Sequence, residues 1–81
     1  MKLIVLDLAR SIDETGLKEM FAPFGEVASA TLVMDKVTGK SKGFGFIEMN
    51  DDEEATKAMT ELTGKKISGQ KIRVRVSTNA G

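Results

Sequence analysis

The chain has 81 residues, one Pro and a hydrophobic content of 41%. This length allows one small domain that buries roughly 60 to 65% of its unfolded surface. The chain lacks Cys and His, which excludes disulfides, thiol nucleophiles, imidazole acid–base chemistry and ordinary zinc sites, and we predict no cofactor. Its 12 basic and 12 acidic residues cancel, and a net charge of zero argues on its face against nucleic acid as a partner.

The sequence predicts neither a targeting segment nor a membrane span. The apolar run of residues 3–6 is interrupted by Asp7, whereas the apolar part of a signal peptide needs about 7 to 15 residues. No apolar run approaches the roughly 18 residues of a membrane span. We therefore expect an intracellular protein, cytoplasmic in location and without a membrane partner.

The charges are unevenly distributed along the chain. Residues 36–46 contain lysines and no acid, and a compact acidic run occupies residues 51–54. A second acid-free stretch holds the basic residues Lys65, Lys66, Lys71, Arg73 and Arg75. Such runs are usually solvated surface, so only their convergence in space would give the basic residues a function.

The first predicted strand covers residues 2–8 and is apolar and rich in branched side chains. Because side chains alternate between the two faces of a strand, Leu3 and Val5 share one face. The opposite face holds Lys2, Ile4 and Leu6.

A helix is predicted after this strand. Asp13 is suited to be its N-cap, and Ser11 with Glu14 offers a competing capping box. Pro23 and Gly25 end the helix. The apolar residues that recur at helical spacing, and that we expect in the core, are Leu17, Met20, Phe21 and Phe24.

A second strand is predicted over residues 27–34, followed by a turn-rich connection over residues 35–41 and a third strand over residues 42–49. Thr38 and Gly39 form the expected tip of the connection. On the second strand, one face holds Ala30 and Leu32, and the other holds Ser29, Thr31 and Val33.

The second helix is capped by Asn50 or Asp51, and its acidic first turn suits the positive end of the helix dipole. Gly64 ends it. Its expected buried stripe consists of Ala55, Ala58, Met59 and Leu62. The last strand, residues 71–76, follows Gly69, and its apolar residues alternate with Lys71, Arg73 and Arg75.

The order strand, helix, strand, strand, helix, strand predicts a two-layer α+β sandwich. In this βαββαβ arrangement a four-stranded antiparallel sheet carries both helices on one face and leaves the other face open. We expect a single domain over residues 1–78 and a short tail over residues 79–81.

The third strand contains the octapeptide KGFGFIEM, which holds two of the four phenylalanines of the chain. If Ile47 and Met49 face the helices, then Phe44 and Phe46 lie exposed on the open face, together with Lys42 and Glu48. Exposed rings flanked by cations suit single-stranded nucleic acid, because each base stacked on a ring contributes roughly 1 to 3 kcal/mol and cations hold the phosphates. The glycines at positions 43 and 45 lie on the other side, where small residues allow a helix to pack closely.

KGFGFIEM resembles the octapeptide of the RNA recognition motif, K/R-G-F/Y-G/A-F-V-x-F/Y. Ile47 stands for the family's Val, and Met49 replaces the last aromatic. Residues 3–8, LIVLDL, are similar to the hexapeptide on the family's first strand, but Ile4 replaces a stacking aromatic and Asp7 replaces the usual Asn. The similarity extends over nearly the whole chain and implies a ferredoxin-like fold.

The resemblance implies that Phe46 stacks a base, that Phe44 contacts a base or the sugars between two nucleotides, and that Lys42 reaches a phosphate or base. Arg73 and Arg75 add charge and hydrogen bonds from the neighbouring last strand. Without an aromatic ring at the Ile4 position, binding is expected to be weaker or altered. The other residues predicted to contact RNA are Ile4, Lys2 and Lys40, followed by Ser77, Thr78 and Asn79 where the chain leaves the sheet.

Other functions remain open at this point. An enzyme of the acylphosphatase type needs a phosphate-cradling loop, and Arg10 has no glycine-rich cradle around it, so we predict no enzyme and no small-molecule substrate. A protein-binding module is the main alternative, favoured by Ile4 and by the zero net charge. Single-stranded DNA is a second alternative, because stacking does not sense the 2′-hydroxyl. The chain resembles the small stand-alone members found in bacteria, or a domain excised from a larger protein.

Overall fold

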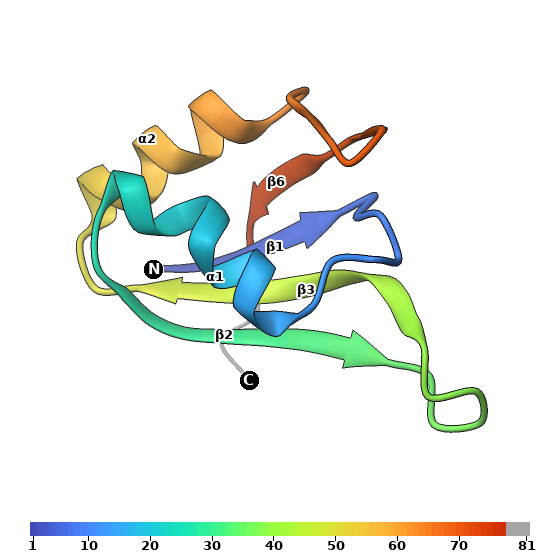
Figure 1. Cartoon of the computed structure of the whole chain (residues 1–81). Coiled ribbons are helices and arrows are strands. Elements are labelled where there is room, and N and C mark those ends of the chain that lie inside the picture. The colour runs from blue at the N-terminus through green and yellow to red at the C-terminus, as the bar shows by residue number, and fades with distance from the viewer. Residues whose placement is uncertain (78–81) are drawn as a thin grey trace.

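The computed structural model describes residues 1–77 and places two helices against one face of a four-stranded antiparallel sheet (Figure 1). The elements are β1 (Lys2–Leu6), α1 (Glu14–Phe21), the 3₁₀ turn η1 (Ala22–Phe24), β2 (Val27–Met34), β3 (Ser41–Met49), α2 (Asp52–Leu62), β4 (Lys66–Ile67), β5 (Gln70–Lys71) and β6 (Arg73–Val76). The strands lie in the order β2-β3-β1-β6. The predicted ferredoxin-like βαββαβ sandwich is confirmed.

Strands β1 and β6 are shorter than predicted, and β3 begins one residue earlier, at Ser41. Strand β1 ends at Leu6 because Asp7 adopts a left-handed conformation, with φ 60°, which breaks the strand and which Asp tolerates better than most residues. Strand β6 starts at Arg73, because the residues before it form a separate small hairpin between β4 and β5. Its turn, Ser68 and Gly69, has positive φ at both positions, as in a type I′ turn. The predicted tail 79–81 and the boundary at residue 78 lie outside the described residues.

Both α-helices have an aspartate as N-cap. The Asp13 side chain accepts a hydrogen bond from the backbone N–H of Gly16 at 2.7 Å, so Asp13 caps α1 and the competing box at Ser11 and Glu14 does not. Helix α1 ends at Phe21, earlier than predicted, and the chain continues as the η1 turn around Pro23.

None of the helices described in residues 1–77 has the length and apolar character needed to cross a membrane.

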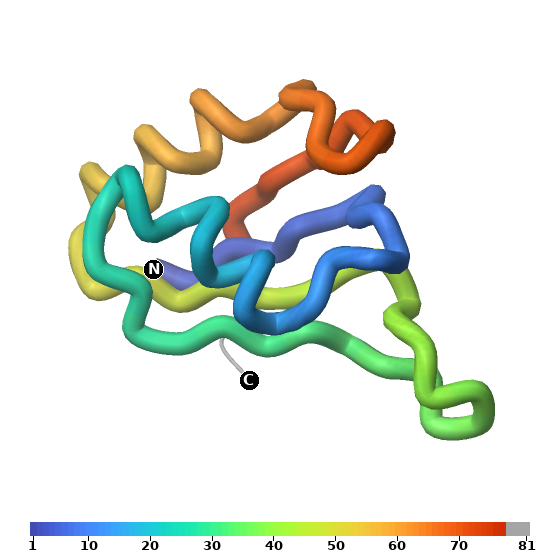
Figure 2. Tube along the Cα trace, viewed as in Figure 1, coloured from blue at the N-terminus to red at the C-terminus, as the bar shows by residue number. Residues whose placement is uncertain are grey.

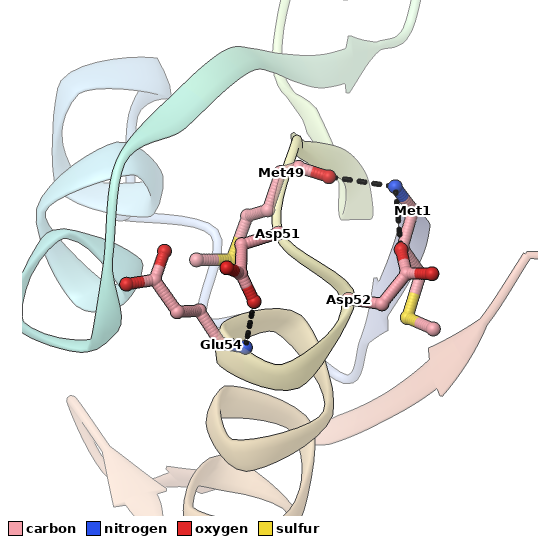
Figure 3. A network of polar contacts seen from close by, with 5 residues as sticks. All are labelled: Met1, Met49, Asp51, Asp52 and Glu54. Atoms are coloured by element: carbon pink, nitrogen blue, oxygen red, sulfur yellow. Dashed lines mark hydrogen bonds and ion pairs between the residues drawn. The ribbon is translucent and has the colours of Figure 1, made fainter.

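Figure 3 shows the start of α2. The Asp51 carboxylate accepts a hydrogen bond from the backbone N–H of Glu54 at 3.0 Å, which identifies Asp51 as the N-cap. The N-terminal amine of Met1 donates to the carbonyl oxygen of Met49 at 2.6 Å and lies 3.6 Å from the Asp52 carboxylate. The end of β3 and the start of α2 are thereby joined to the start of β1.

The core fills the space between the sheet and the helices. Its buried residues are Leu3, Val5, Leu8, Ala9, Ile12, Leu17, Phe21, Ile47, Met49, Ala55, Ala58, Leu62, Ile72 and Val74. Met20, Phe24 and Met59, which we predicted in the core, are only partly buried at its margin. Val76, at the end of β6, is 39% exposed.

Gly45 explains why a glycine lies in the middle of β3. A Cβ atom at this position would lie 2.6 Å from the carbonyl oxygen of Thr31 and 2.9 Å from Cδ2 of Leu17. A side chain here would clash with the backbone of β2 and with the Leu17 side chain of α1. The prediction that a small residue allows close helix packing is confirmed at Gly45 and wrong at Gly43, where the nearest atom to an added Cβ would be the Leu8 carbonyl oxygen of the β1–α1 loop.

Candidate nucleic-acid interface

The face of the sheet opposite the helices is not covered by any element of residues 1–77 (Figure 1). We call this surface the open face. By strand alternation its side chains are Lys2, Ile4 and Leu6 on β1, Phe44, Phe46 and Glu48 on β3, Arg73 and Arg75 on β6, and Ser29, Thr31 and Val33 on β2. None of them is buried, whereas Leu3, Val5 and Ile47, which alternate with them, are 0% exposed.

Phe44 and Phe46 form an aromatic pair on the open face. Their ring centroids lie 6.4 Å apart, and the ring planes make an angle of 84°, an edge-to-face arrangement. Both rings are partly buried, so they are less exposed than we predicted. The edge-to-face contact and the Lys2 ammonium, which lies 5.1 Å from the centroid of the Phe46 ring, shield part of their surface.

A row of four residues crosses the centre of the open face. Phe46 pairs with Thr31 of β2 on one side and with Ile4 of β1 on the other, and Ile4 pairs in turn with Arg75 of β6. Ile4 is therefore placed outward, as predicted, between an aromatic ring and a guanidinium. The row offers one flat ring, one aliphatic surface and one cation in succession.

Two contacts of charged groups on this face were not foreseen from the sequence. Arg73 Nη1 lies 3.9 Å from Asp7 Oδ2, and each side chain is about half exposed, at 54% and 53%. The other contact is the stacking of Lys2 over Phe46. Within residues 1–77, Arg75 has no acidic partner at ion-pair distance. The strand register, which sequence patterns do not fix, would have been needed to find the Asp7–Arg73 pair.

Acidic residues concentrate on the helical layer. The acidic side chains of α1 and α2 are Glu14, Glu19, Asp52, Glu53, Glu54 and Glu61, against which these helices carry Lys18 and Lys57. The open face instead has Lys2, Arg73 and Arg75 against Glu48. The helical layer is therefore net acidic and the open face net basic, although the charges of the whole chain cancel. Across residues 1–77, His, Cys, Asp and Glu side chains form no group of three or more suited to a metal ion.

The remaining predicted contact residues lie at the rim of this surface. Lys42 and Lys40 line a concave region beside Phe44. Ser77 follows β6, and its backbone N–H donates to the Lys2 carbonyl at 2.8 Å. Thr78 and Asn79 lie outside the described residues.

Comparison with known proteins agrees with this geometry. Residues 3–73 match the family model of the RNA recognition motif, and the chain belongs to this family. It is 42% identical to the mitochondrial glycine-rich RNA-binding protein 4 of Arabidopsis thaliana, over 95% of this chain and 57% of that protein. It is 44% identical to the cytoplasmic and nuclear polyadenylate-binding protein of Eremothecium gossypii, over 95% of this chain and 13% of that protein.

Solved structures give the same assignment. The crystal structure of the RNA-binding protein PG1 has a TM-score of 0.94 and 33% sequence identity, covering 100% of this chain and 98% of that one. The second RRM domain of a yeast poly(U)-binding protein has a TM-score of 0.87 and 28% identity, covering 99% and 96%. The curated relatives named above come from a plant and a fungus, so the suggested bacterial origin is not borne out. The chain spans 57% and 13% of the lengths of these two relatives.

Proposed function

We propose that this domain binds single-stranded RNA across the open face of its sheet. The observation that carries the proposal is the Phe44–Phe46 pair on a surface that the helices leave uncovered. Aromatic rings on a sheet stack successive bases, and basic side chains around them hold the phosphates. The membership of the RNA recognition motif family and the RNA-binding names of the relatives support the same function.

We give the rings, the central aliphatic residue and the cations of the open face separate roles. Phe46 stacks one base, and Phe44 contacts a second base or the sugars between two nucleotides. Ile4, at the centre of the row, gives a base apolar contact without a π face, so it contributes less than an aromatic would. Arg75 and Lys2 contact phosphates, while Arg73 is partly neutralised by Asp7. Ser77 lies near enough to β1 to add contacts from its hydroxyl.

The proposed role is binding rather than catalysis, in keeping with the absence of Cys and His and with the names of the relatives. The relatives are mitochondrial in one case and cytoplasmic and nuclear in another, so the cytoplasm stays a prediction for this chain. Single-stranded DNA is the alternative that the following experiment separates directly from RNA, and a protein partner becomes the favoured alternative if no nucleic-acid probe binds.

The test is fluorescence anisotropy with labelled octanucleotides. Suitable probes are oligo(A), oligo(U), oligo(C) and a GU repeat, each as RNA and DNA, since relatives include polyadenylate- and poly(U)-binding proteins. We expect saturable binding of at least one RNA. Phe46→Leu keeps apolar bulk but removes the ring, and should weaken binding by roughly 1 to 3 kcal/mol, whereas Phe46→Tyr should retain it. The proposal would be refuted if no probe bound, or if Phe46→Leu bound RNA as tightly as the parent. Tighter binding of DNA than of RNA would indicate single-stranded DNA as the ligand.

A further inference from the structure

A concave region with a volume of about 420 Å³ adjoins Phe44 at the end of the sheet. Three separate segments contribute to it: the loop between β1 and α1, the loop between β2 and β3, and the start of β3. The lining residues that bear charge or hydrogen-bonding groups include Arg10, Asp35, Thr38, Lys40 and Lys42. We call this region the rim cavity. Sequence patterns gave Arg10 no role, because nothing in them indicates that it lies beside Lys42.

A bulge in β3 lies where the loop that carries Arg10 contacts this strand. The register of β2 and β3 shifts between the pairs Leu32–Gly45 and Met34–Ser41, and Gly43 within the shift has φ +86°, a conformation that glycine adopts without strain. The carbonyl oxygen of Gly43 accepts a hydrogen bond from Leu8 N–H at 2.8 Å. The loop that carries Arg10 is thereby attached to β3, and Figure 2 shows the two segments side by side.

The opposite wall of the rim cavity is held by hydrogen bonds within the β2–β3 loop. Asp35 N–H donates to the Lys40 carbonyl at 2.7 Å, and Gly39 N–H donates to the Asp35 carbonyl at 2.8 Å. The Asp35 carboxylate accepts from the N–H groups of Val37 and Thr38. The wall is therefore ordered before any ligand arrives, which lowers the entropy cost of binding.

The cations of the rim cavity are available to a ligand. Within residues 1–77, none of Arg10, Lys40 and Lys42 forms an ion pair, even though Asp35 lines the same cavity. All three side chains are exposed. Thr38 Oγ1 accepts a hydrogen bond from Lys40 N–H at 3.3 Å, which leaves its own hydroxyl hydrogen to donate.

We propose that the rim cavity binds one phosphate group of the RNA, adjacent to the nucleotide at Phe44, and so extends the binding site beyond the sheet. Arg10 supplies the planar fork of donors that suits phosphate oxygens, and Lys40 and Lys42 supply point charges. The inference rests on the proposed function, since the phosphate is placed next to the RNA nucleotide that contacts Phe44. The same chemistry accepts either an internal phosphodiester or a terminal phosphate.

The test compares two double variants that remove the same charge. Arg10→Gln/Lys40→Gln alters the rim cavity; Lys36→Gln/Lys57→Gln removes one cation from the same β2–β3 loop and one from α2, both exposed and outside the cavity lining. The probe is the tightest RNA of the panel, shortened until its affinity begins to fall. We expect the cavity variant to bind about 5- to 30-fold more weakly than the parent at low salt. Its slope of log affinity against log salt should fall by about 0.7, the value of one phosphate contact on a single strand. The control should change affinity less than threefold.

A second set of probes identifies the phosphate. One neutral methylphosphonate linkage is placed at each position of the same RNA in turn, and a matching set carries a 5′- or 3′-terminal phosphate. We expect one position at which the neutral linkage lowers the RNA affinity of the parent but not that of the cavity variant. If an added terminal phosphate raises the affinity of the parent and not that of the variant, the bound group is a terminal phosphate instead. The inference is wrong if both double variants bind RNA equally well and if every neutral linkage changes the affinity of the parent and of the cavity variant by the same factor. In that case Phe46→Leu still weakens binding if the proposed function is right, so the two failures are distinguishable.

Discussion

The two faces of the sheet are built from the same strands but under different constraints. On β3, Ile47 and Met49 point to the helices and are 0% exposed, while Phe44 and Phe46 alternate with them on the open face and stay partly exposed. The helix-covered face is apolar because folding buries it. Folding makes no comparable demand on the open face, so large rings placed there indicate a ligand rather than a core.

The faces also differ in charge. The acidic residues of α1 and α2 lie behind the covered face, and the cations of β1 and β6 project from the other. A chain of zero net charge can therefore present a basic surface to a polyanion. For this protein the distribution of charge over the fold indicates the kind of partner, whereas the net charge does not.

The largest expected effect breaks the open face without breaking the fold. Phe44→Ala/Phe46→Ala should weaken RNA binding by roughly 2 to 5 kcal/mol, the sum expected for two aromatic contacts to bases. The free energy of unfolding should fall by much less than the free energy of RNA binding, because neither ring is in the buried core. Anisotropy titration and urea denaturation followed by circular dichroism measure the two quantities. An unfolded double variant would show that the rings are structural.

The reverse experiment breaks the covered face one residue away. Ile47→Ala should lower the free energy of unfolding by about 2 to 5 kcal/mol, since it leaves a cavity beneath the helices, and Ile47→Val by about 0.5 to 1.5 kcal/mol. Because Ile47→Val stays folded, its RNA affinity should equal that of the parent within twofold. A large loss of RNA affinity in folded Ile47→Val would contradict the claim that the covered face stabilises the fold and the open face binds RNA.

A third variant sharpens the open face by adding a ring. Ile4 lies between Phe46 and Arg75 on that face, so Ile4→Tyr adds an aromatic surface without entering the core. Affinity should increase by up to roughly 1 to 3 kcal/mol, and stability should change by less than about 1 kcal/mol. The parent has no Tyr or Trp, so the new ring also reports binding by its fluorescence. Unchanged or weaker affinity in a stable variant would mean that bases do not cross β1.

The smallest expected effect concerns the charge of the open face. Asp7→Asn removes the carboxylate that lies 3.9 Å from Arg73, and Asn tolerates the left-handed conformation of this residue. The freed Arg73 should tighten RNA binding by about 0.2 to 1 kcal/mol, in the range of an exposed ion pair. The gain should disappear when the substitution is made in an Arg73→Gln background. A gain that persists there would assign the effect to something other than Arg73.

Much of the fold could be predicted because its signals are local. Strand alternation placed Leu3, Val5 and Ile4 on their faces, and Asp13 and Asp51 were among the N-cap candidates that the sequence offered for the two α-helices. The β4–β5 hairpin was missed because strands of two residues are too short to show a period, although Ser68–Gly69 is a recognisable turn signal. The early end of β1 depends on one residue, Asp7, whose left-handed backbone does not follow from its neighbours.

The candidate site was predicted less completely. Alternation and the family resemblance identified the open-face rings and cations, because those depend on one strand at a time. The Asp7–Arg73 pair, the Lys2–Phe46 contact and the position of Arg10 depend on how separate segments meet. The first depends on the register between β1 and β6, the second on the register between β1 and β3, and the third on the contact of the β1–α1 loop with β3 at Gly43; none of these follows from a local pattern.

The central claim is that the open face, and not the helical face, receives single-stranded RNA. Titration of the ¹⁵N-labelled protein with the tightest RNA of the panel, followed by amide and aromatic NMR shifts, tests it most directly. We predict the largest shifts in β1, β3 and β6 and in the rings of Phe44 and Phe46, with the exposed residues of α1 and α2 almost unchanged. Shifts that concentrate on α1 and α2 while the two rings stay unperturbed would contradict the account.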